Sequence, residues 1–287
     1  MVIAMKIKLA LPKGRLYNEI ESLLKDAEIK ISTNGRNYRP NVNDPEIQLK
    51  ILKPQNIPKL VELGSQDVAF TGYDWVLEQN ADVEELMDLS FNPVKIVAAI
   101  PKQLKIDKTS KSSIRVVSEY EKISRDYLDK KGFNYVFIKS FGATESFIPE
   151  DADMIIDNTS TGRTLKENNL VIYDDVLKSS TRLIANKDAI NDPWKKKKIE
   201  NLITLFQSVL EARNRVLIEM NVSEDKLDTL IPKLPCMKSP TISKLYGEQG
   251  YAIKIAVTKD KIPNLIPLLK KEGATDILVF DLKKVIP

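Results

Sequence analysis

The chain has 287 residues, with 44 lysines and arginines, 40 acidic residues, one cysteine and no histidine. Without histidine it cannot form a Ser-His-Asp triad, a Cys-His dyad or a histidine-ligated zinc site. One cysteine also excludes an internal disulfide and a cysteine-ligated cluster. Catalysis would therefore depend on carboxylates, lysine, arginine, tyrosine, hydroxyls or backbone amides. Any metal would be a hard cation with oxygen ligands, shared with a substrate.

The net charge of +4 comes from interleaved acidic and basic residues, which argues against a nucleic-acid partner. Lys6 and Lys8 interrupt the first apolar run, which is typical of a strand rather than a signal peptide. No stretch reaches the roughly 20 apolar residues of a membrane helix. We therefore expect a soluble, cytoplasmic protein with no membrane partner.

Strand-like and helix-like segments alternate through the first two thirds of the chain. Apolar periodicity predicts strands at 5–11, 47–52, 67–71, 94–100, 114–118, 134–138, 153–156, 170–173 and 181–185, and helices at 14–27, 56–63, 121–131 and 163–168. This alternation favours an α/β fold of largely parallel sheets with helices on both faces. At about 150 residues per domain, the length suggests two or three domains.

The last third of the chain has a different pattern. A wide apolar stripe predicts one long helix over 194–220. A compact series follows, with helices at 223–230 and 261–271 and strands at 251–257 and 276–280. We predict a small α+β domain that begins near residue 215.

The segment from Asp153 to Leu165 carries the sharpest chemical signal. A short apolar strand ends at Asp157, a loop of hydroxyl residues with Gly162 follows, and then a helix begins. Free N–H groups at a helix start favour a phosphate dianion, and glycine lets the backbone approach it closely. Asp157 lies where open α/β sheets bind ligands, and its carboxylate would accept hydrogen bonds from ribose hydroxyls. The alternative is an ordinary Ser/Thr helix cap, but the number of hydroxyls exceeds what a cap needs.

Three further turns follow predicted strands. The first, Lys13-Gly14-Arg15, carries two cations, the second contains Gly72 and Asp74, and the third brings Glu145. Each has an ordinary explanation, because cations at a helix start are often solvated and Asp74 could be a simple cap. Together, in two α/β units, the turns predict an anion-binding cleft between two lobes.

This combination resembles the ATP phosphoribosyltransferase family in its long form, the first enzyme of histidine biosynthesis. The matching segments are 11–16 (Leu-Pro-Lys-Gly-Arg-Leu), 67–74, 141–145 (Phe-Gly-Ala-Thr-Glu), 153–170 and 234–241 (Leu-Pro-Cys-Met-Lys-Ser-Pro-Thr). The resemblance implies a two-lobed catalytic part like a type II periplasmic binding protein, with a ferredoxin-like C-terminal regulatory domain. We place catalytic lobe I at 1–98 with 187–214, lobe II at 99–186, and the regulatory histidine-binding domain at 215–287.

The resemblance also implies roles for particular residues. Those expected to hold phosphoribosyl pyrophosphate are Asp157, Asn158, Thr159, Ser160, Thr161, Gly162, Arg163 and Thr164. Those expected on the ATP and pyrophosphate side are Lys13, Gly14, Arg15, Gly72, Asp74 and Glu145, with Glu145 the one candidate for a catalytic base. Those expected to contact histidine are Asn221, Met237, Ser239, Thr241 and Ala274.

By this resemblance, N1 of ATP would displace pyrophosphate from the sugar, giving N1-(5-phosphoribosyl)-ATP. Mg²⁺ would accompany the leaving group, and no direct metal ligand is assigned. Free histidine would inhibit by feedback, in a homo-oligomer that we expect to form dimers and hexamers.

Two other readings stay open at this point. One is a non-catalytic amino-acid or nucleotide sensor on a binding-protein scaffold, because fold does not fix function. The other is prephenate dehydratase, which Ser180-Thr181-Arg182-Leu183 faintly resembles. The phosphate loop, together with Lys13 and Arg15, favours the phosphoribosyltransferase.

Overall fold

A computed structural model describes residues 5–32, 37–106, 112–247 and 249–286. The chain divides into two compact units, one formed mainly by residues up to Glu200 and the other mainly by residues from Asn201 onward. Within the described ranges, no helix is both long enough and apolar enough to cross a membrane.

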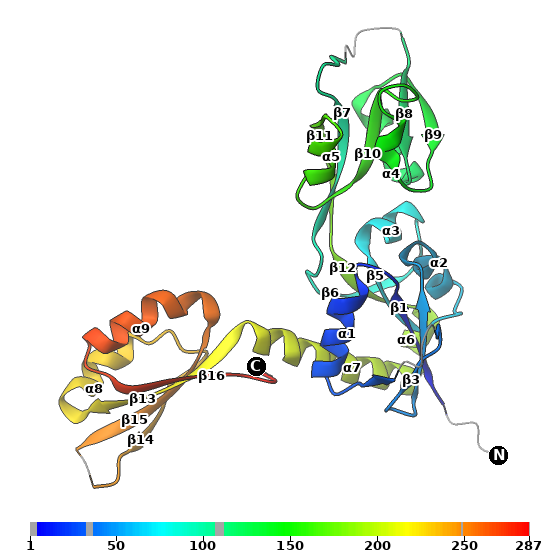
Figure 1. Ribbon diagram of the computed structural model, residues 1–287. Coiled ribbons are helices and arrows are strands. Elements are labelled where there is room, and N and C mark those ends of the chain that lie inside the picture. The colour runs from blue at the N-terminus through cyan, green and yellow to red at the C-terminus, as the bar shows by residue number, and fades with distance from the viewer. Residues whose placement is uncertain (1–4, 33–36, 107–111, 248, 287) are drawn as a thin grey trace. The chain divides into compact units, whose positions relative to one another are not determined.

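The first unit contains a five-stranded sheet in the order β4-β1-β5-β12-β6 (Figure 1). Its strands are β1 (Ile7–Pro12), β4 (Ile47–Leu52), β5 (Val68–Gly72), β6 (Glu84–Asp88) and β12 (Thr181–Ala185). Strand β1 runs parallel to β4 and β5, whereas β12 is antiparallel to β5 and β6. Ile57 and Val61 of helix α2 (Ile57–Glu62) pack on Ala10, Ala69 and Ile184. This packing holds one face of the sheet against α2.

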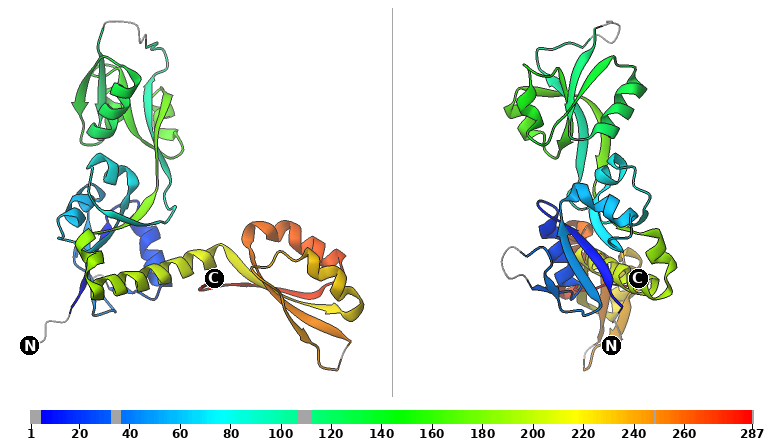
Figure 2. Two further views of the ribbon diagram at one scale, coloured as in Figure 1. Left: turned by 180° about the vertical axis from the view of Figure 1, so that it is seen from behind. Right: turned by 90° about the vertical axis from the view of Figure 1, so that its right-hand side faces the viewer.

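A second five-stranded sheet in the same unit has the order β11-β7-β10-β8-β9. Its strands are β7 (Val94–Pro101), β8 (Ile114–Ser118), β9 (Tyr135–Lys139), β10 (Met154–Thr159) and β11 (Leu170–Ser179). Helix α4 (Glu121–Lys131) packs on one face and Leu165 of helix α5 (Arg163–Glu167) on the other (Figure 2). Helices therefore cover both faces, as the sequence predicts. Each lobe of this periplasmic-binding-protein-like part is built on one of these two sheets.

The remaining elements of the first unit are short, except for α1. They are α1 (Tyr17–Asp26), α3 (Tyr73–Glu78), α6 (Lys187–Asn191), the 3₁₀ turns Pro54–Asn56 and Thr144–Phe147, and a two-stranded ribbon of β2 (Ile31–Ser32) and β3 (Asn41–Val42). The expectation of largely parallel sheets is only partly correct, because β7 and β11 pair antiparallel, as do β12 and β5. The sequence pattern does not reveal this, since buried strands of either direction have similar apolar runs.

The chain changes sheet between β6 and β7 and again between β11 and β12. We expected lobe boundaries at 98 and 186, but β7 lies wholly in the second sheet and β12 wholly in the first. The first crossover lies between Asp88 and Val94. It contains Ser90 and Asn92, which both adopt positive φ, and Pro93. These residues interrupt an extended strand. The second crossover passes through Ser180.

The second unit is a four-stranded antiparallel sheet in the order β14-β15-β13-β16. Its elements are β13 (Arg215–Ser223), α8 (Glu224–Leu230), the 3₁₀ turn Ile231–Lys233, β14 (Thr241–Lys244), β15 (Gly250–Thr258), the 3₁₀ turn Lys259–Lys261, α9 (Ile262–Lys271) and β16 (Thr275–Asp281). This βαββαβ succession is the ferredoxin-like fold that we expected. Its core joins Ile218, Ile253 and Ile255 to Leu265 and Leu269 of α9.

The long helix predicted over 194–220 is wrong in its last turns. Helix α7 runs from Pro193 to Arg213, and β13 begins at Arg215. From Val216 to Val222 every second residue is buried, which is the period of a strand. Val216 satisfies both the helical and the strand pattern, so apolar spacing alone extends the helix too far.

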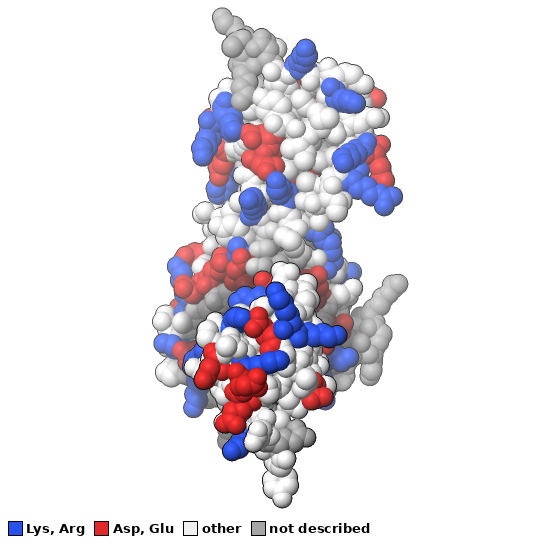
Figure 3. All heavy atoms as spheres, turned by 90° about the vertical axis from the view of Figure 1, so that its left-hand side faces the viewer, with Lys and Arg blue, Asp and Glu red and all other residues white. Residues whose placement is uncertain are grey.

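Charged side chains are mixed over the surface. On the face drawn in Figure 3, lysine and arginine lie among aspartate and glutamate rather than in one basic block. Ion pairs link many of these residues, for example Arg115 with Asp153 at 3.0 Å and Arg125 with Glu121 at 3.0 Å. This agrees with the interleaved charges of the sequence.

Candidate active site

A cleft of about 320 Å³ in the first unit brings together groups from both of its lobes. Five of the predicted site residues line it: Lys13, Arg15, Gly72, Asp74 and Asn158. Its other lining residues are Leu16, Pro54, Trp75, Asn92, Val94, Tyr120, Ser179 and Ser180. The turns at Lys13–Arg15 and Gly72–Asp74 therefore meet Asn158 in one cleft, whereas Gly14, Glu145 and the other seven residues of the predicted phosphate loop do not line it.

The turn after β1 supplies the two cations of this cleft. Gly14 adopts a φ of +87°, which favours glycine, and its carbonyl accepts the Tyr17 N–H at 3.0 Å to start α1. The Lys13 N–H donates to the Leu52 carbonyl at 2.6 Å, which fixes the turn to the neighbouring strand β4. Lys13 and Arg15 are both exposed, so their charges are available to an anionic ligand.

Asp74 lies at the centre of a hydrogen-bond network that joins the two lobes. Its carboxylate is buried and accepts the Ser179 hydroxyl at 2.6 Å and the Tyr120 hydroxyl at 2.9 Å. The Asn158 amide donates to the Tyr120 oxygen at 3.2 Å. Burial and the neighbouring Asp74 raise the pKa of Tyr120 well above its usual value, so the phenol remains a donor. Asp74 is thus a structural acceptor rather than a helix cap, since the N-cap of α3 (Tyr73–Glu78) is Gly72 and no side chain caps it.

The aromatic groups behind Asp74 also pack across the lobes. The Trp75 and Tyr120 rings stack with centroids 4.7 Å apart. Gly72 is required for close approach, since a Cβ there would stand 2.3 Å from the Asp74 carboxylate oxygen. Glu78 of α3 accepts the Lys122 and Ile123 N–H groups at 3.2 and 3.1 Å, capping helix α4 of the other lobe.

The first three residues of the predicted phosphate loop, Asp157, Asn158 and Thr159, belong to β10, and the helix after the loop is short. Gly162 adopts a φ of +73°, and its N–H donates to the Thr159 hydroxyl at 3.0 Å. The Thr161 hydroxyl accepts the Arg163 N–H at 3.4 Å. The side chains of Ser160 and Thr164 are exposed. Helix α5 has only five residues, so its dipole adds less than a long helix would, and the donors are mainly local hydroxyls and amides.

Arg163 points along its own helix. Its guanidinium pairs with Glu167 at 2.7 Å, with 83% of its side chain exposed. The side chain therefore faces solvent, although the resemblance places Arg163 among the residues that hold phosphoribosyl pyrophosphate. The cations of the site are therefore Lys13 and Arg15, from the other lobe.

Asp157 lies half-buried among other acids. Its carboxylate accepts the Asn158 N–H at 2.6 Å. Burial, with the nearby negative charges of Glu145 and Glu119, raises the pKa of Asp157 to about 6. The Asn158 N–H and the Thr144 hydroxyl act in the opposite direction, since they stabilise the ionised form. Glu145 therefore lies near Asp157, on the phosphate-loop lobe, rather than among the residues that line the cleft.

Sequence reasoning missed the groups that connect the lobes. Tyr120, Trp75 and Ser179 carry the network around Asp74, yet none stands out as a motif. Only their positions in the chain pointed to a role. Tyr120 directly precedes helix α4, shortly after strand β8, and Ser179 is the last residue of strand β11. Arg182, the residue behind the dehydratase reading, pairs with Glu85 at 2.9 Å and stacks on Tyr73, so its charge is already committed.

The residues predicted to contact histidine do not meet in one place within a single chain. Asn221 pairs with Thr275 across β13 and β16, beside buried Ala274. Thr241 lies on β14, at the opposite edge of the sheet, with Met237 and Ser239 in the segment before it. Strands are spaced about 4.8 Å apart, so the edges β14 and β16 are separated by roughly 14 Å. Thr241 is therefore on an edge strand and Ala274 precedes the opposite edge strand, whereas Asn221 lies on the inner strand β13.

The described residues include no group of three acidic or cysteine side chains placed to hold a metal ion. Carboxylates near the loop, such as Asp157 and Glu145, still offer the oxygen ligands that Mg²⁺ prefers. A metal that enters with a polyphosphate would keep substrate oxygens and water as its other ligands. The site therefore fits a metal carried by its substrate better than a protein cage.

Fold and cleft together define a two-lobed α/β protein of the periplasmic-binding type, with a cleft lined by two cations and an appended ferredoxin-like domain. The sequence matches the family ATP phosphoribosyltransferase over residues 53–208 and the C-terminal domain of that family over 212–284. The chain belongs to the ATP phosphoribosyltransferase family, in its long form.

Full-length relatives agree with this. The ATP phosphoribosyltransferase of Pelotomaculum thermopropionicum is 40% identical over 289 residues, covering 99% of this chain and 100% of that one. The enzyme of Thermodesulfovibrio yellowstonii is 40% identical, covering 98% of each chain. Among solved structures, a chain of the ATP phosphoribosyl transferase (HisG:HisZ) complex from Thermotoga maritima matches with a TM-score of 0.65 and 27% identity. That match covers 72% of this chain and 98% of the other.

Proposed function

We propose that this chain transfers the 5-phosphoribosyl group of phosphoribosyl pyrophosphate to N1 of ATP, the first step of histidine biosynthesis. The observation that carries the proposal is the single cleft that joins Lys13 and Arg15 to Asp74 and to Asn158 of the phosphate loop. The cleft offers cations for a pyrophosphate, and the adjoining loop offers hydroxyl and amide donors for a phosphate. Membership of the family supplies the reaction.

In this reaction the bond between the anomeric carbon and pyrophosphate breaks, and a bond from that carbon to adenine N1 forms. The sugar gains positive charge as the leaving group gains negative charge. Lys13 and Arg15 would stabilise the departing pyrophosphate, and Asp157 would hold the ribose hydroxyls. No covalent enzyme intermediate is needed, so the protein contributes mainly position and charge. Mg²⁺, bound with the pyrophosphate, would neutralise part of its charge.

A direct assay tests this proposal. The chain is incubated with ATP, phosphoribosyl pyrophosphate and Mg²⁺, with pyrophosphatase to remove the product, and the adduct is identified by mass. We expect an adduct only when both substrates are present. If substrate binding is measurable but no adduct forms under any of these conditions, the protein is a sensor rather than a transferase.

Free histidine would inhibit the enzyme through the ferredoxin-like domain. The predicted contacts are spread across one sheet, with Ala274 beside the edge strand β16, Asn221 on the inner strand β13 and Thr241 on the opposite edge strand β14. A complete histidine site would therefore combine edges from two copies of the chain. This arrangement supports a homo-oligomer, with dimers and hexamers as the proposed forms. Inhibition at a distance also needs two global states that differ in histidine affinity.

We expect Thr241→Ala to raise the histidine concentration that halves the rate by about tenfold, because a lost hydrogen bond costs about 1 kcal/mol or slightly more. Each variant is measured against its own uninhibited rate. Ser243→Ala is the matched control, since Ser243 is exposed two residues further along the same strand. Equal histidine sensitivity in the two variants would remove Thr241 from the effector site.

A further inference from the structure

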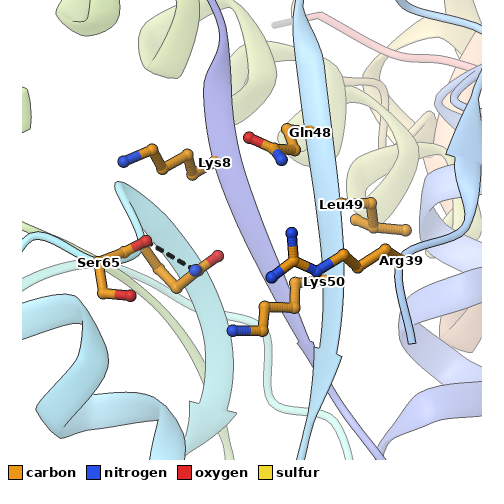
Figure 4. A pocket seen from close by; sticks show the side chains of 7 residues that line it. Lys8, Arg39, Gln48, Leu49, Lys50 and Ser65 are labelled. Atoms are coloured by element: carbon orange, nitrogen blue, oxygen red, sulfur yellow. Dashed lines mark hydrogen bonds between the residues drawn. The ribbon is translucent and has the colours of Figure 1, made fainter.

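Three cationic side chains border a second pocket in the first unit. Lys8, Arg39 and Lys50 line a cavity of about 180 Å³ at the edge of the first sheet, with polar groups from Gln48, Ser65 and Gln66 (Figure 4). No residue of this pocket lines the cleft described above. The pocket is therefore a separate feature of the lobe.

The backbone fixes where these cations stand. Lys8 on β1 lies opposite Gln48 on β4, and Lys50 follows two residues later on the same face of the sheet. Arg39 comes from the segment before β3. That segment is tied to β4 because the Ile51 N–H donates to the Tyr38 carbonyl at 2.9 Å. The convergence of these three side chains thus follows from strand register and from one backbone hydrogen bond.

The opposite side of the pocket is equally well anchored. Ser65 and Gln66 lie in the turn after α2, where the Gln66 N–H donates to the Leu60 carbonyl at 3.1 Å. The Gln66 amide is 5% exposed, and it donates to the Ser65 carbonyl at 2.7 Å. In Figure 4 Ser65 lies on the other side of the cavity from Lys50. The wall of the pocket is therefore formed by fixed polar groups.

The positive charge of this pocket is not compensated within the described part of the chain. Neither Lys8, Arg39 nor Lys50 forms an ion pair there. The acids nearby in sequence are engaged elsewhere. Asp67 holds Lys195 at 2.8 Å and accepts the Lys8 backbone N–H at 2.8 Å.

Other neighbouring carboxylates are also occupied. Asp44 and Glu46 both bind Lys198, at 2.7 and 2.6 Å, and Glu62 binds Lys59. Three like charges around one concave surface repel one another and raise the local positive potential. A multivalent anion would relieve that repulsion.

The size of the pocket limits what it can hold. A drug-sized ligand typically needs roughly 300 Å³ or more, so a whole nucleotide would not be enclosed. We propose that this pocket binds a small multivalent oxyanion of the phosphate class, free phosphate or pyrophosphate, outside the active cleft. Lysine and arginine form their strongest hydrogen bonds with such anions, and the Gln48 amide adds a neutral donor. This proposal does not depend on the activity proposed above.

The test counts binding sites by equilibrium dialysis of the full chain against radiolabelled pyrophosphate and, separately, phosphate. We expect the unmodified chain to bind at two sites, the cleft and the pocket. The pocket variant K8Q/R39Q/K50Q should lose one site, and the cleft variant K13Q/R15Q should lose the other. If the pocket variant keeps both sites, or if the cleft variant keeps none, the proposal is overturned.

Two further variants separate the pocket from general charge effects. K270Q/K271Q/K283Q removes the same three charges from exposed positions of the other unit, and it should keep both sites. The charge-conserving variant K8R/R39K/K50R should retain the second site. Should the triple glutamine variant fail to fold, Lys50→Gln alone is measured, and we expect about tenfold weaker binding at that site. Unchanged binding in Lys50→Gln would contradict the proposal.

Competition with ATP in the same dialysis distinguishes a pocket that binds a free ion from one that binds the phosphate groups of a nucleotide. ATP should displace pyrophosphate from the cleft and leave the pocket occupied. Displacement from both sites would overturn the assignment to a free ion. Binding at the pocket should also weaken steeply as chloride rises, because its cations are exposed to screening.

Discussion

Asp157→Asn should lower kcat/KM for phosphoribosyl pyrophosphate by about 100-fold or more. In the proposed function the carboxylate accepts ribose hydroxyls, and losing one preorganised charged partner typically costs that much. An amide keeps the shape of the side chain but not its charge. Initial rates at several concentrations of each substrate would show the loss mainly in this parameter, with a smaller change for ATP. A variant with the activity of the unmodified chain would contradict the loop assignment.

The same carboxylate should make kcat/KM of the enzyme fall as the solution becomes more acidic. The pKa of Asp157 is raised to about 6 by burial and the neighbouring acids, so the group protonates as pH falls through 6. Since kcat/KM reports the free enzyme, it should decline there. The substrate phosphate also titrates near pH 6. In the Asp157→Asn variant, kcat/KM should therefore still fall with the protonation of the substrate phosphate, but the additional fall caused by protonation of Asp157 should be absent.

This raised pKa also predicts a gain in stability for the variant. A carboxyl whose pKa is higher in the folded state than in the unfolded state disfavours folding once both forms are ionised. The penalty is absent below the ordinary pKa of 3.8 and complete above about 6. Because Asp157 is partly exposed, we expect Asp157→Asn to raise the free energy of unfolding at pH 8 by about 1–2 kcal/mol. Urea unfolding at pH 8 and at pH 4 would check the sign, with little difference expected at pH 4.

Asp74→Ala should lower the free energy of unfolding by about 3 kcal/mol. Its buried carboxylate accepts the hydroxyls of Ser179 and Tyr120, and both would lose their acceptor. Each unsatisfied buried donor costs about 1–3 kcal/mol. Thermal or urea unfolding measures the loss. The variant should also bind ATP less well, because the network that aligns the two walls of the cleft would be broken.

Controls for this variant exist in the same network. Asp74→Asn retains an oxygen for Ser179 and should cost about 1 kcal/mol. Ser180→Ala changes a neighbouring hydroxyl that bonds to Asp88 rather than Asp74, so it should have little effect on the network. If Asp74→Ala is no less stable than Ser180→Ala, the network does not hold the lobes.

The sequence was most informative where backbone conformation and chemistry coincide. Gly14 and Gly162 both take positive φ at strand-to-helix turns, so their positions in the sequence marked real turns of the backbone. Strand β4 and helix α4 lie at the residues that periodicity predicted. Local patterns of this kind are fixed by neighbours in the chain, and a single sequence contains them.

Features that depend on distant neighbours were less accessible. Nothing local reveals that Tyr120 and Asp74 share a hydrogen bond, because they are 46 residues apart and lie in different lobes. Strand direction is similarly hidden, which is why β12 was assigned to the wrong lobe. Helix α7 was extended past Arg213 because Val216 fits two periods. In each case tertiary pairing, rather than local propensity, determines the outcome.

The strand order has a consequence for synthesis on the ribosome. Strand β6 lies at the edge of the first sheet and bonds to β12, which is formed about a hundred residues later. The second sheet, in contrast, is built entirely from residues 94–179 in one continuous stretch. The inserted lobe can therefore complete its sheet while the lobe that emerged first still lacks β12, the last of its five strands in chain order. A nascent chain passes through a stage in which its middle is finished and its beginning is not.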